Sequence, residues 1–237
     1  MLDSHRNPFP NASMPALASA AERVYENSGN RPLLDLLSTQ PGRILDCGCG
    51  AGANARLLSC LGWKVTGITI SPAEQCAAAP YCEEVYLADL ELGLPPGLGS
   101  DYNAVLLSHV LEHLAHPEVL LRALRSVLAP SGVLGVALPN VLFYPNRLRF
   151  LLGKFEYTSS GIMDDTHLRF YTFNTGAELL RSSAYRIVRA EADGAFPLWK
   201  LRGWLPPSFV GRFNRGASAI WPGLFGLQSL YIAVADS

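Results

Sequence analysis

A glycine-rich loop is the part of this chain best suited to chemistry. Residues 44–52 read Ile-Leu-Asp-Cys-Gly-Cys-Gly-Ala-Gly, so Asp46 closes a short apolar run and glycines follow it at alternate positions. Glycine adopts positive φ without strain and lets the backbone approach a ligand closely. The pattern predicts a sharp turn after a buried strand, at a ligand site. The Gly-x-Gly-x-x-Gly spacing typical of dinucleotide-binding proteins fits it poorly.

A second group of reactive side chains follows. His109, Glu112, His113 and His116 stand at i, i+3, i+4 and i+7, so on a helix they would share one face. In one interpretation Glu112 and His113 are structural and His109 lines a cofactor or substrate pocket. In the other, Glu112 and His113 bind a divalent metal together with His167. A set rich in imidazole suits zinc or another borderline metal better than magnesium.

The composition is that of one globular domain. The chain has 237 residues, 49% hydrophobic content and a net charge of −1, so no basic surface indicates a nucleic-acid partner. Its five cysteines form no Cys-x-x-Cys pair, and the first residues lack the apolar core of a signal peptide. We therefore expect a cytoplasmic protein with free thiols. Residues 216–235 carry no charge, but Pro222 interrupts them, which favours a loop and a final strand over a transmembrane helix.

These residues must be positioned by alternating strands and helices. We expect an N-terminal helix over 15–37 with a break at 29–32, and later a strand over 185–190 and a last strand over 229–235. Between them the pattern predicts strands at 44–46, 64–69, 84–89, 102–108 and 132–138, with helices at 53–61, 72–79, 117–128, 147–152 and 175–182. Repeated β-α units predict a doubly wound, mostly parallel sheet. Ligands bind at the carboxyl ends of such strands, where Asp46, Thr69, Asp89, Ser108 and His109 are expected to meet.

The chain is expected to form a single domain, residues 1–237. It would comprise a helical segment (1–40), a cofactor-binding core (41–139) and a part with substrate-side loops, a cap and the final strands (140–237). The aromatic stretch 196–225 could be a substrate lid, a contact with a membrane surface, or a cap packed on the sheet. Its prolines argue against a continuous interfacial helix.

Several motifs in this order resemble the class I S-adenosylmethionine-dependent methyltransferases. The glycine loop resembles their first motif, Asp89-Leu90-Glu91 their acid beside adenine, and Leu138-Pro139-Asn140 the end of a later strand. The run GIMDDTHLRFYT at 161–172 resembles a bacterial branch that often accompanies glycan and cell-envelope biosynthesis. The resemblance implies a Rossmann-like, seven-stranded fold and S-adenosylmethionine as cofactor.

The resemblance also implies roles for individual residues. The loop glycines would pack against the cofactor while Asp46 orders the loop, Thr69 would meet the ribose and Asp89 the adenine amine. The implied cofactor-binding set is Asp46, Gly48, Cys49, Gly50, Gly52, Thr69, Ile70, Asp89, Leu90 and Ser108.

One position departs from the family pattern. The second strand usually ends in Asp or Glu, which grips the ribose hydroxyls, whereas this chain has Thr69. A neutral hydrogen bond is about half as strong as a charge-assisted one. Glu74 or Gln75, one helical turn on, could compensate. Alternatively, Thr69 caps the following helix together with Ser71.

Methyl transfer to oxygen or nitrogen also requires removal of a proton, and histidine is the natural base near neutral pH. His167 is the first candidate, because the resemblance places its loop over the methyl end of the cofactor; His109 is a second. Asp164 or Asp165 could orient His167 or raise its pKa. The alternative is that His167 only staples the loop by bonding backbone carbonyls.

The expected function is S-adenosylmethionine-dependent methylation of an oxygen atom of a small-molecule, sugar or glycolipid acceptor. A peripheral membrane contact is compatible with such an acceptor. Two alternatives stay open: a metal-assisted O-methyltransferase that uses Glu112, His113 and His167, and a non-catalytic protein that binds the cofactor. The sequence does not indicate the oligomeric state.

Overall fold

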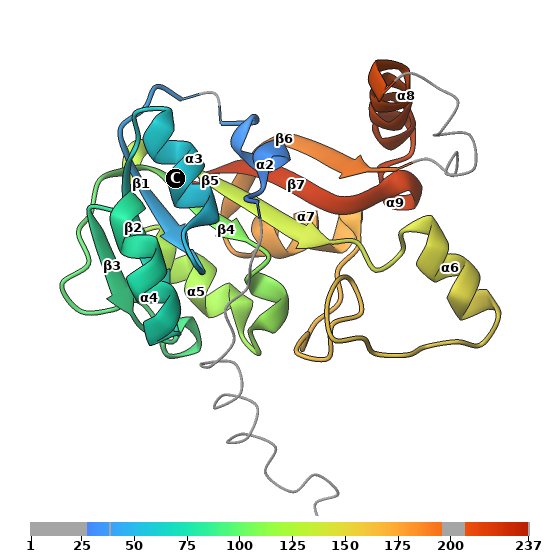
Figure 1. Ribbon diagram of the computed structural model, residues 1–237, viewed down its shortest axis with the longest axis horizontal. Coiled ribbons are helices and arrows are strands. Elements are labelled where there is room, and N and C mark those ends of the chain that lie inside the picture. Colours follow the sequence, from blue (N-terminus) through green and yellow to red (C-terminus); the bar gives the residue numbers. More distant parts are fainter. Residues whose placement is uncertain (1–27, 38, 196–206, 237) are drawn as a thin grey trace, which may run out of the picture.

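The computed structural model describes residues 28–37, 39–195 and 207–236, which form a sheet with helices on both faces (Figure 1). The predictions for residues 1–27 and 196–206 lie outside this range. The strands are β1 (Arg43–Cys47), β2 (Lys64–Thr69), β3 (Glu84–Leu87), β4 (Tyr102–Ser108), β5 (Leu128–Pro139), β6 (Tyr185–Gly194) and β7 (Gly226–Ala235). The α-helices are α2 (Arg31–Leu34), α3 (Ala53–Cys60), α4 (Pro72–Ala78), α5 (Pro117–Leu124), α6 (Tyr144–Leu151), α7 (Phe173–Ser182), α8 (Pro207–Ile220) and α9 (Pro222–Phe225).

The seven strands form one mixed sheet in the order β3-β2-β1-β4-β5-β7-β6. β1 to β5 pair in parallel, and β7 pairs antiparallel with both β5 and β6. The strand order reverses at β1, which lies between β2 and β4, so the carboxyl ends of these three strands border one crevice. The expected seven-stranded, Rossmann-like architecture is confirmed.

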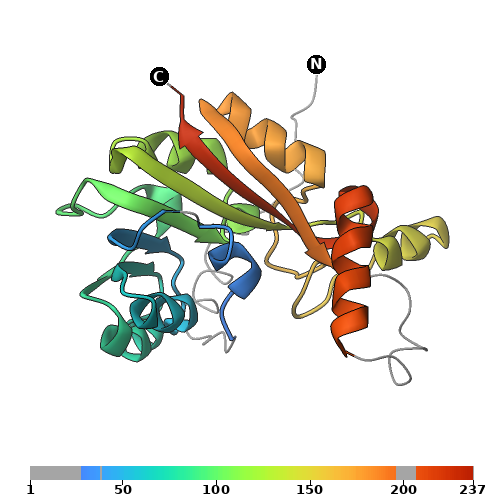
Figure 2. The same ribbon diagram turned by 90° about the horizontal axis from the view of Figure 1, so that it is seen from above.

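Both faces of the sheet are buried along the central strands. Along β1, Ile44 packs with residues of α2 and α3, and Leu45 packs with residues of α5 and α7 on the opposite face. Successive side chains of a strand point to opposite faces, so a strand covered on both sides reads as a continuous apolar run. Figure 2 shows α2 and α3 on one side of the sheet and α5 and α7 on the other. This enclosure fixes the strand ends that carry the polar residues.

Several predicted boundaries differ from the structure. The expected break is present at residues 29 and 30, but it is shorter than 29–32, because α2 begins at Arg31. Asn30 is the N-cap of α2, its side chain accepts a hydrogen bond from the Leu33 N–H, and Pro32 stands in the first turn. The helix expected over 117–128 ends at Leu124, because β5 already begins at Leu128. The helix expected over 147–152 begins three residues earlier, at Tyr144.

The carboxy-terminal part completes the sheet. β6 runs outwards to the edge, and β7 returns between β5 and β6 (Figure 2). The uncharged stretch 216–235 comprises the end of α8, α9 and β7, which supports the strand interpretation. None of the helices in residues 28–37, 39–195 and 207–236 has the length and apolar content to cross a membrane.

Candidate functional site

The glycine loop joins β1 to α3 at the crevice. Gly48, Gly50 and Gly52 all have positive φ, at 72°, 52° and 83°. A Cβ on Gly52 would lie 2.8 Å from the Ala78 backbone, so this glycine permits close packing of the loop on α4. A Cβ on Gly50 would meet only the Glu74 Oε1 atom, at 3.7 Å. Of these two glycines, therefore, Gly50 faces open space that a ligand can enter.

Asp46 is a buried carboxyl group with a weakly placed partner. It is fully buried, and neither carboxylate oxygen makes a hydrogen bond of good geometry within the described residues. Burial raises the pKa of Asp46 to about 7, and the neighbouring Asn54 side chain offsets this only in part. A buried carboxylate that lacks donors is costly. The arrangement is suited to a ligand that brings a cation or donors to the loop.

The raised pKa makes stability depend on pH. Since Asp46 binds its proton more tightly in the folded chain than at its ordinary pKa of 3.8, the folded state without ligand loses stability as pH rises from about 4 to about 7. We expect Asp46→Asn to remove this loss. The free energy of unfolding of the variant should therefore increase relative to that of the unchanged protein by up to about 1.4 kcal/mol per pH unit in that window. Urea unfolding between pH 4 and 8 measures the difference. Parallel pH profiles for the two proteins would contradict the expectation.

Thr69, at the end of β2, is tied to the following helix. Its hydroxyl donates to Glu74 Oε2 at 2.7 Å and accepts from the Ser71 N–H at 3.3 Å. Ser71 is the N-cap of α4, since its side chain accepts from the Glu74 N–H. Thr69 therefore supports the turn into α4, as the capping alternative expected, and it also places a carboxylate at the crevice.

The other predicted strand-end residues lie along the same carboxyl edge. Asp89 follows β3, and its Oδ1 accepts from the Glu91 N–H, which begins a short 3₁₀ turn. Ser108 ends β4, and its hydroxyl accepts from Asn30 Nδ2 at 3.1 Å. Ile70 and Leu90 stand next to Thr69 and Asp89 in the sequence and are partly buried.

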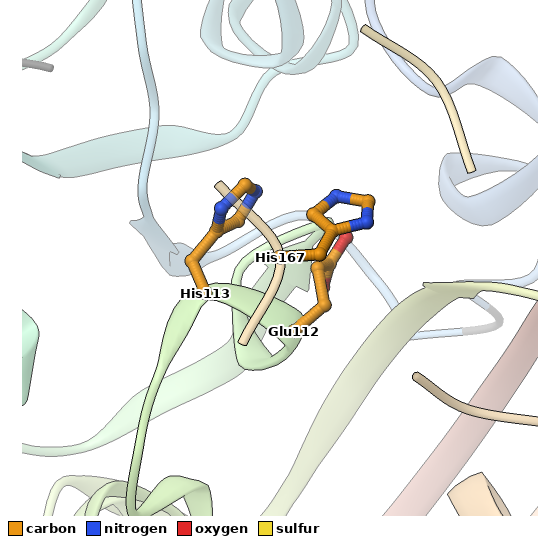
Figure 3. Close-up of side chains that lie close together, drawn as sticks. All are labelled: Glu112, His113 and His167. Carbon is orange, nitrogen blue, oxygen red and sulfur yellow. The ribbon is translucent and has the colours of Figure 1, made fainter. Parts of the chain in front are cut away.

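Three potential metal ligands converge beside this edge. One ligand atom each of Glu112, His113 and His167 lies within 4.8 Å of the others. Figure 3 shows Glu112 and His113 projecting from one short segment, with the Glu112 carboxylate beside the ring of His167, which comes from a separate loop. Glu112 is fully buried, and neither of its carboxylate oxygens makes a hydrogen bond of good geometry within the described residues.

Each of the two imidazoles is oriented by a hydrogen bond that its Nδ1 donates to a backbone carbonyl. His167 Nδ1 lies 3.1 Å from the Ile162 carbonyl, which can only accept, so Nδ1 carries the proton and Nε2 keeps its lone pair. His113 Nδ1 lies 3.3 Å from the Thr166 carbonyl and is oriented in the same way. Burial lowers the pKa of His167 and outweighs the opposing carboxylate of Glu112. A neutral imidazole with a free Nε2 is suited either to accept a proton or to bind a metal.

His109 lies between Glu112 and Gln228. Its Nδ1 is 3.3 Å from Glu112 Oε1, and its Nε2 is 3.0 Å from Gln228 Oε1. Burial lowers its pKa, but Glu112 and then Gln228 outweigh this, so the pKa is raised overall. With two acceptors as partners, a protonated His109 satisfies both contacts. It is thus the neighbour of the Glu112 carboxylate and does not belong to the converging set.

Comparison with known proteins places the chain in a family. The sequence profile of a family described as a methyltransferase domain matches residues 20–189. The chain belongs to this family. It is 33% identical over 106 residues to the ubiquinone biosynthesis O-methyltransferase of Caulobacter sp. (strain K31), a match that covers 41% of each protein. The chain thus spans less than half the length of that relative.

Solved structures share the fold. An S-adenosylmethionine-dependent methyltransferase from Archaeoglobus fulgidus matches 81% of this chain and 86% of its own with a TM-score of 0.56 at 22% identity. The 1,6-didemethyltoxoflavin-N1-methyltransferase of Burkholderia thailandensis, solved with S-adenosylhomocysteine, matches 87% of this chain and 78% of its own with a TM-score of 0.55 at 15% identity. Family and fold confirm the expected class, that of S-adenosylmethionine-dependent methyltransferases.

The expectation that four residues from His109 to His116 share one helical face is wrong. The residues from His109 to His116 do not form one helical face, because His109 has a φ of 58° and only Leu111–His113 form a 3₁₀ turn. His116 instead pairs with Glu118, with 3.5 Å between His116 Nδ1 and Glu118 Oε1.

Asp164 does not orient His167 by a hydrogen bond. Its Oδ1 accepts from the N–H and from the hydroxyl of Thr166, at 2.8 and 2.6 Å. The Thr166 hydroxyl oxygen in turn lies 3.1 Å from His113 Nδ1. Asp164 therefore supports His113 through Thr166. The bond of His167 to a backbone carbonyl agrees with the loop-stapling alternative, and the same bond frees Nε2.

Sequence reasoning did not identify three polar residues of the methyltransferase. Gln228 Oε1 accepts from Asn30 Nδ2 at 2.9 Å, and Gln228 Nε2 donates to Asp193 at 3.1 Å, so these residues connect α2, β6 and β7 next to His109. Gln228 and the adjacent Ser229 are polar residues in an otherwise apolar strand, and this is the signal that could have indicated Gln228. Asn30 and Asp193 stand in ordinary polar surroundings and give no such signal.

Proposed function

We propose that this methyltransferase transfers a methyl group to a hydroxyl oxygen of a small-molecule acceptor, with His167 as the proton acceptor. The free Nε2 of a buried, neutral His167 is the observation that supports this role. When bound, S-adenosylmethionine supplies a methyl carbon attached to a sulfonium. His167 Nε2 would take up the proton that the acceptor hydroxyl loses as its oxygen gains the methyl group, and S-adenosylhomocysteine would be the other product.

The cofactor fits residues of the glycine loop. The buried carboxyl of Asp46, which makes no hydrogen bond of good geometry, and the space at Gly50 suit a ligand that carries an ammonium group and must lie against bare backbone. Thr69, Asp89 and Ser108 line the same edge and would hold its adenosyl part, as the family resemblance implies.

A row of aromatic rings supports an acceptor with an apolar portion. Ring centroids lie 6.2 Å apart from His167 to Phe170, 6.0 Å from Phe170 to Phe155, and 5.8 Å from Phe155 to Tyr157. Phe155 and Tyr157 are more than half exposed, and Leu151 is 83% exposed. Apolar surface of this kind beside a site often marks a contact with ligand or lipid. A lipid-linked sugar or phenol is the acceptor class that this surface favours.

Calorimetry and a transfer assay test the proposal. S-adenosylhomocysteine should bind the purified protein, and labelled methyl groups should pass to members of a panel of phenols and sugars, each tested with and without a long alkyl or polyprenyl chain. Binding without transfer to any acceptor would favour the non-catalytic alternative. Absence of binding would contradict the proposed function as a whole.

A second candidate function is metal-assisted O-methylation, and the convergence of Glu112, His113 and His167 favours it. Two imidazoles and a carboxylate suit zinc or a similar borderline metal and leave positions for the oxygens of an acceptor diol. A bound cation would polarise an acceptor hydroxyl and lower its pKa. His167 would then bind the metal and would not accept the proton.

Metal binding can be tested on the protein itself. We expect Glu112→Gln to weaken Zn²⁺ binding by more than the roughly 10- to 100-fold that loss of an outer partner costs. Thr166→Val, which removes such an outer partner of His113, should fall within that smaller range. Calorimetry with Zn²⁺ alone measures both, and His116→Ala is the control that should change nothing. Undiminished activity in excess chelator would contradict this candidate.

A further inference from the structure

The end of β2 carries Thr69 and no acid. Thr69 has a neutral hydroxyl, and that hydroxyl is already engaged by Glu74 and by the Ser71 N–H. A ribose has two adjacent hydroxyl groups, and a carboxylate can accept from both of them. Thr69 alone therefore cannot supply this interaction, so another side chain at the same edge has to.

Gln75 is not that side chain. Its Nε2 donates to the Val85 carbonyl at 2.7 Å, which ties α4 to the neighbouring strand β3. The amide is thus directed along the sheet towards β3. Rotation of Gln75 towards the crevice would break this bond and leave the Val85 carbonyl without its donor.

Glu74 has the required position. It lies in the first turn of α4 and is only 5% exposed, although it carries a carboxylate. Thr69 holds its Oε2 at 2.7 Å. Among the described residues other than Gly50 and its chain neighbours, Glu74 Oε1 is the one atom within 4 Å of where a Cβ on Gly50 would stand. The carboxylate therefore faces the glycine loop across the gap between β1 and β2.

We infer that Glu74 is the acid that binds the ribose hydroxyls of the adenosyl cofactor, and that Thr69 is its positioning residue. The inference rests on the proposed function, because it assumes an adenosyl ligand in the crevice. In this chain the acid stands on the helix that follows β2, and the threonine at the strand end holds it in place. Thr69 thus acts through Glu74 on the cofactor.

The test compares two ligands and several variants by calorimetry. S-adenosylhomocysteine and its 2′-deoxyribose analogue are titrated into the full chain. We expect Glu74→Gln to weaken S-adenosylhomocysteine binding by about 10- to 100-fold, as loss of a charge-assisted hydrogen bond predicts, and to change binding of the deoxy analogue much less. Thr69→Val should lower the same affinity by a smaller factor, because it only frees the carboxylate.

Matched variants separate this role from a structural one. Gln75→Ala, on the same helical turn, should leave the preference for the ribose hydroxyl unchanged. The double variant Thr69→Asp with Glu74→Ala returns an acid to the strand end and should bind S-adenosylhomocysteine at least about 10-fold more tightly than Glu74→Ala alone. Equal affinities for these two variants would overturn the inference.

The failure of the inference differs from the failure of the proposed function. If the unchanged protein binds S-adenosylhomocysteine and Glu74→Gln binds it equally well, or loses both ligands equally, Glu74 is not the ribose ligand while the proposed function stands. If the unchanged protein does not bind S-adenosylhomocysteine, the proposed function fails and the inference fails with it.

Discussion

Substitution of Gly50 by alanine is expected to reduce the affinity for S-adenosylhomocysteine by on the order of 100-fold, equivalent to about 3 kcal/mol. The added methyl group would project into the open side of the glycine loop, where only Glu74 Oε1 is near. The φ of 52° costs the folded state about 1–2 kcal/mol for a residue with a Cβ, but no neighbouring atom has to move. The variant should therefore fold and fail to bind, which calorimetry and thermal unfolding together detect.

Gly52→Ala is the matched comparison. Its Cβ would stand 2.8 Å from the Ala78 backbone, so α4 or the loop would have to shift. We expect this variant to lose more stability than Gly50→Ala and to bind weakly because it is partly unfolded. Retention of full cofactor affinity by Gly50→Ala would show that the ligand does not lie against this part of the loop.

Substitution of His167 by alanine is expected to lower the rate of methyl transfer by roughly 10²- to 10⁴-fold, which is the usual contribution of a positioned base. Binding of S-adenosylhomocysteine should change little, since His167 lies on the loop and not on the glycine-rich edge. The rate is measured with whichever acceptor the unchanged protein methylates.

The pH dependence of the methyl-transfer rate is a second test of the role of His167. Because burial holds its pKa below the ordinary 6.5, the base is already neutral at pH 7. The rate should therefore rise with pH only below about 6.5 and stay level above it, unless another group titrates. Alanine at the exposed His116 should leave both rate and profile unchanged. A His167→Ala variant with an unchanged rate would remove this residue from the mechanism.

The sheet and the glycine loop could be predicted because their signals are local. An enclosed strand such as β1 shows its burial as an apolar run, and a sharp turn after it demands glycine. What the sequence could not separate were the roles of Gly50 and Gly52. Those roles depend on α4, which packs against one of them and leaves the other open.

The histidine cluster was predicted in composition but not in geometry. A regular helix through His109 was the assumption, and the positive φ of that residue breaks it. Glu112 and His113 still meet His167, because the 161–172 loop returns over the 3₁₀ turn and the Leu168 N–H donates to the Glu112 carbonyl. Such a contact between distant segments leaves no periodic trace in a sequence. The indirect support that Asp164 gives to His113 is of the same kind.

The placement of β7 has a consequence for how the chain acquires its structure. β7 is synthesised after the other six strands of the sheet, yet it fills an interior position, with β5 on one side and β6 on the other. Until it arrives, both neighbours present unpaired edges, which are prone to associate with other chains. Assembly has to wait for pairings between residues far apart in sequence, and such topologies fold slowly. A ribosome-bound intermediate that still lacks β7 would thus be the species most in need of a chaperone.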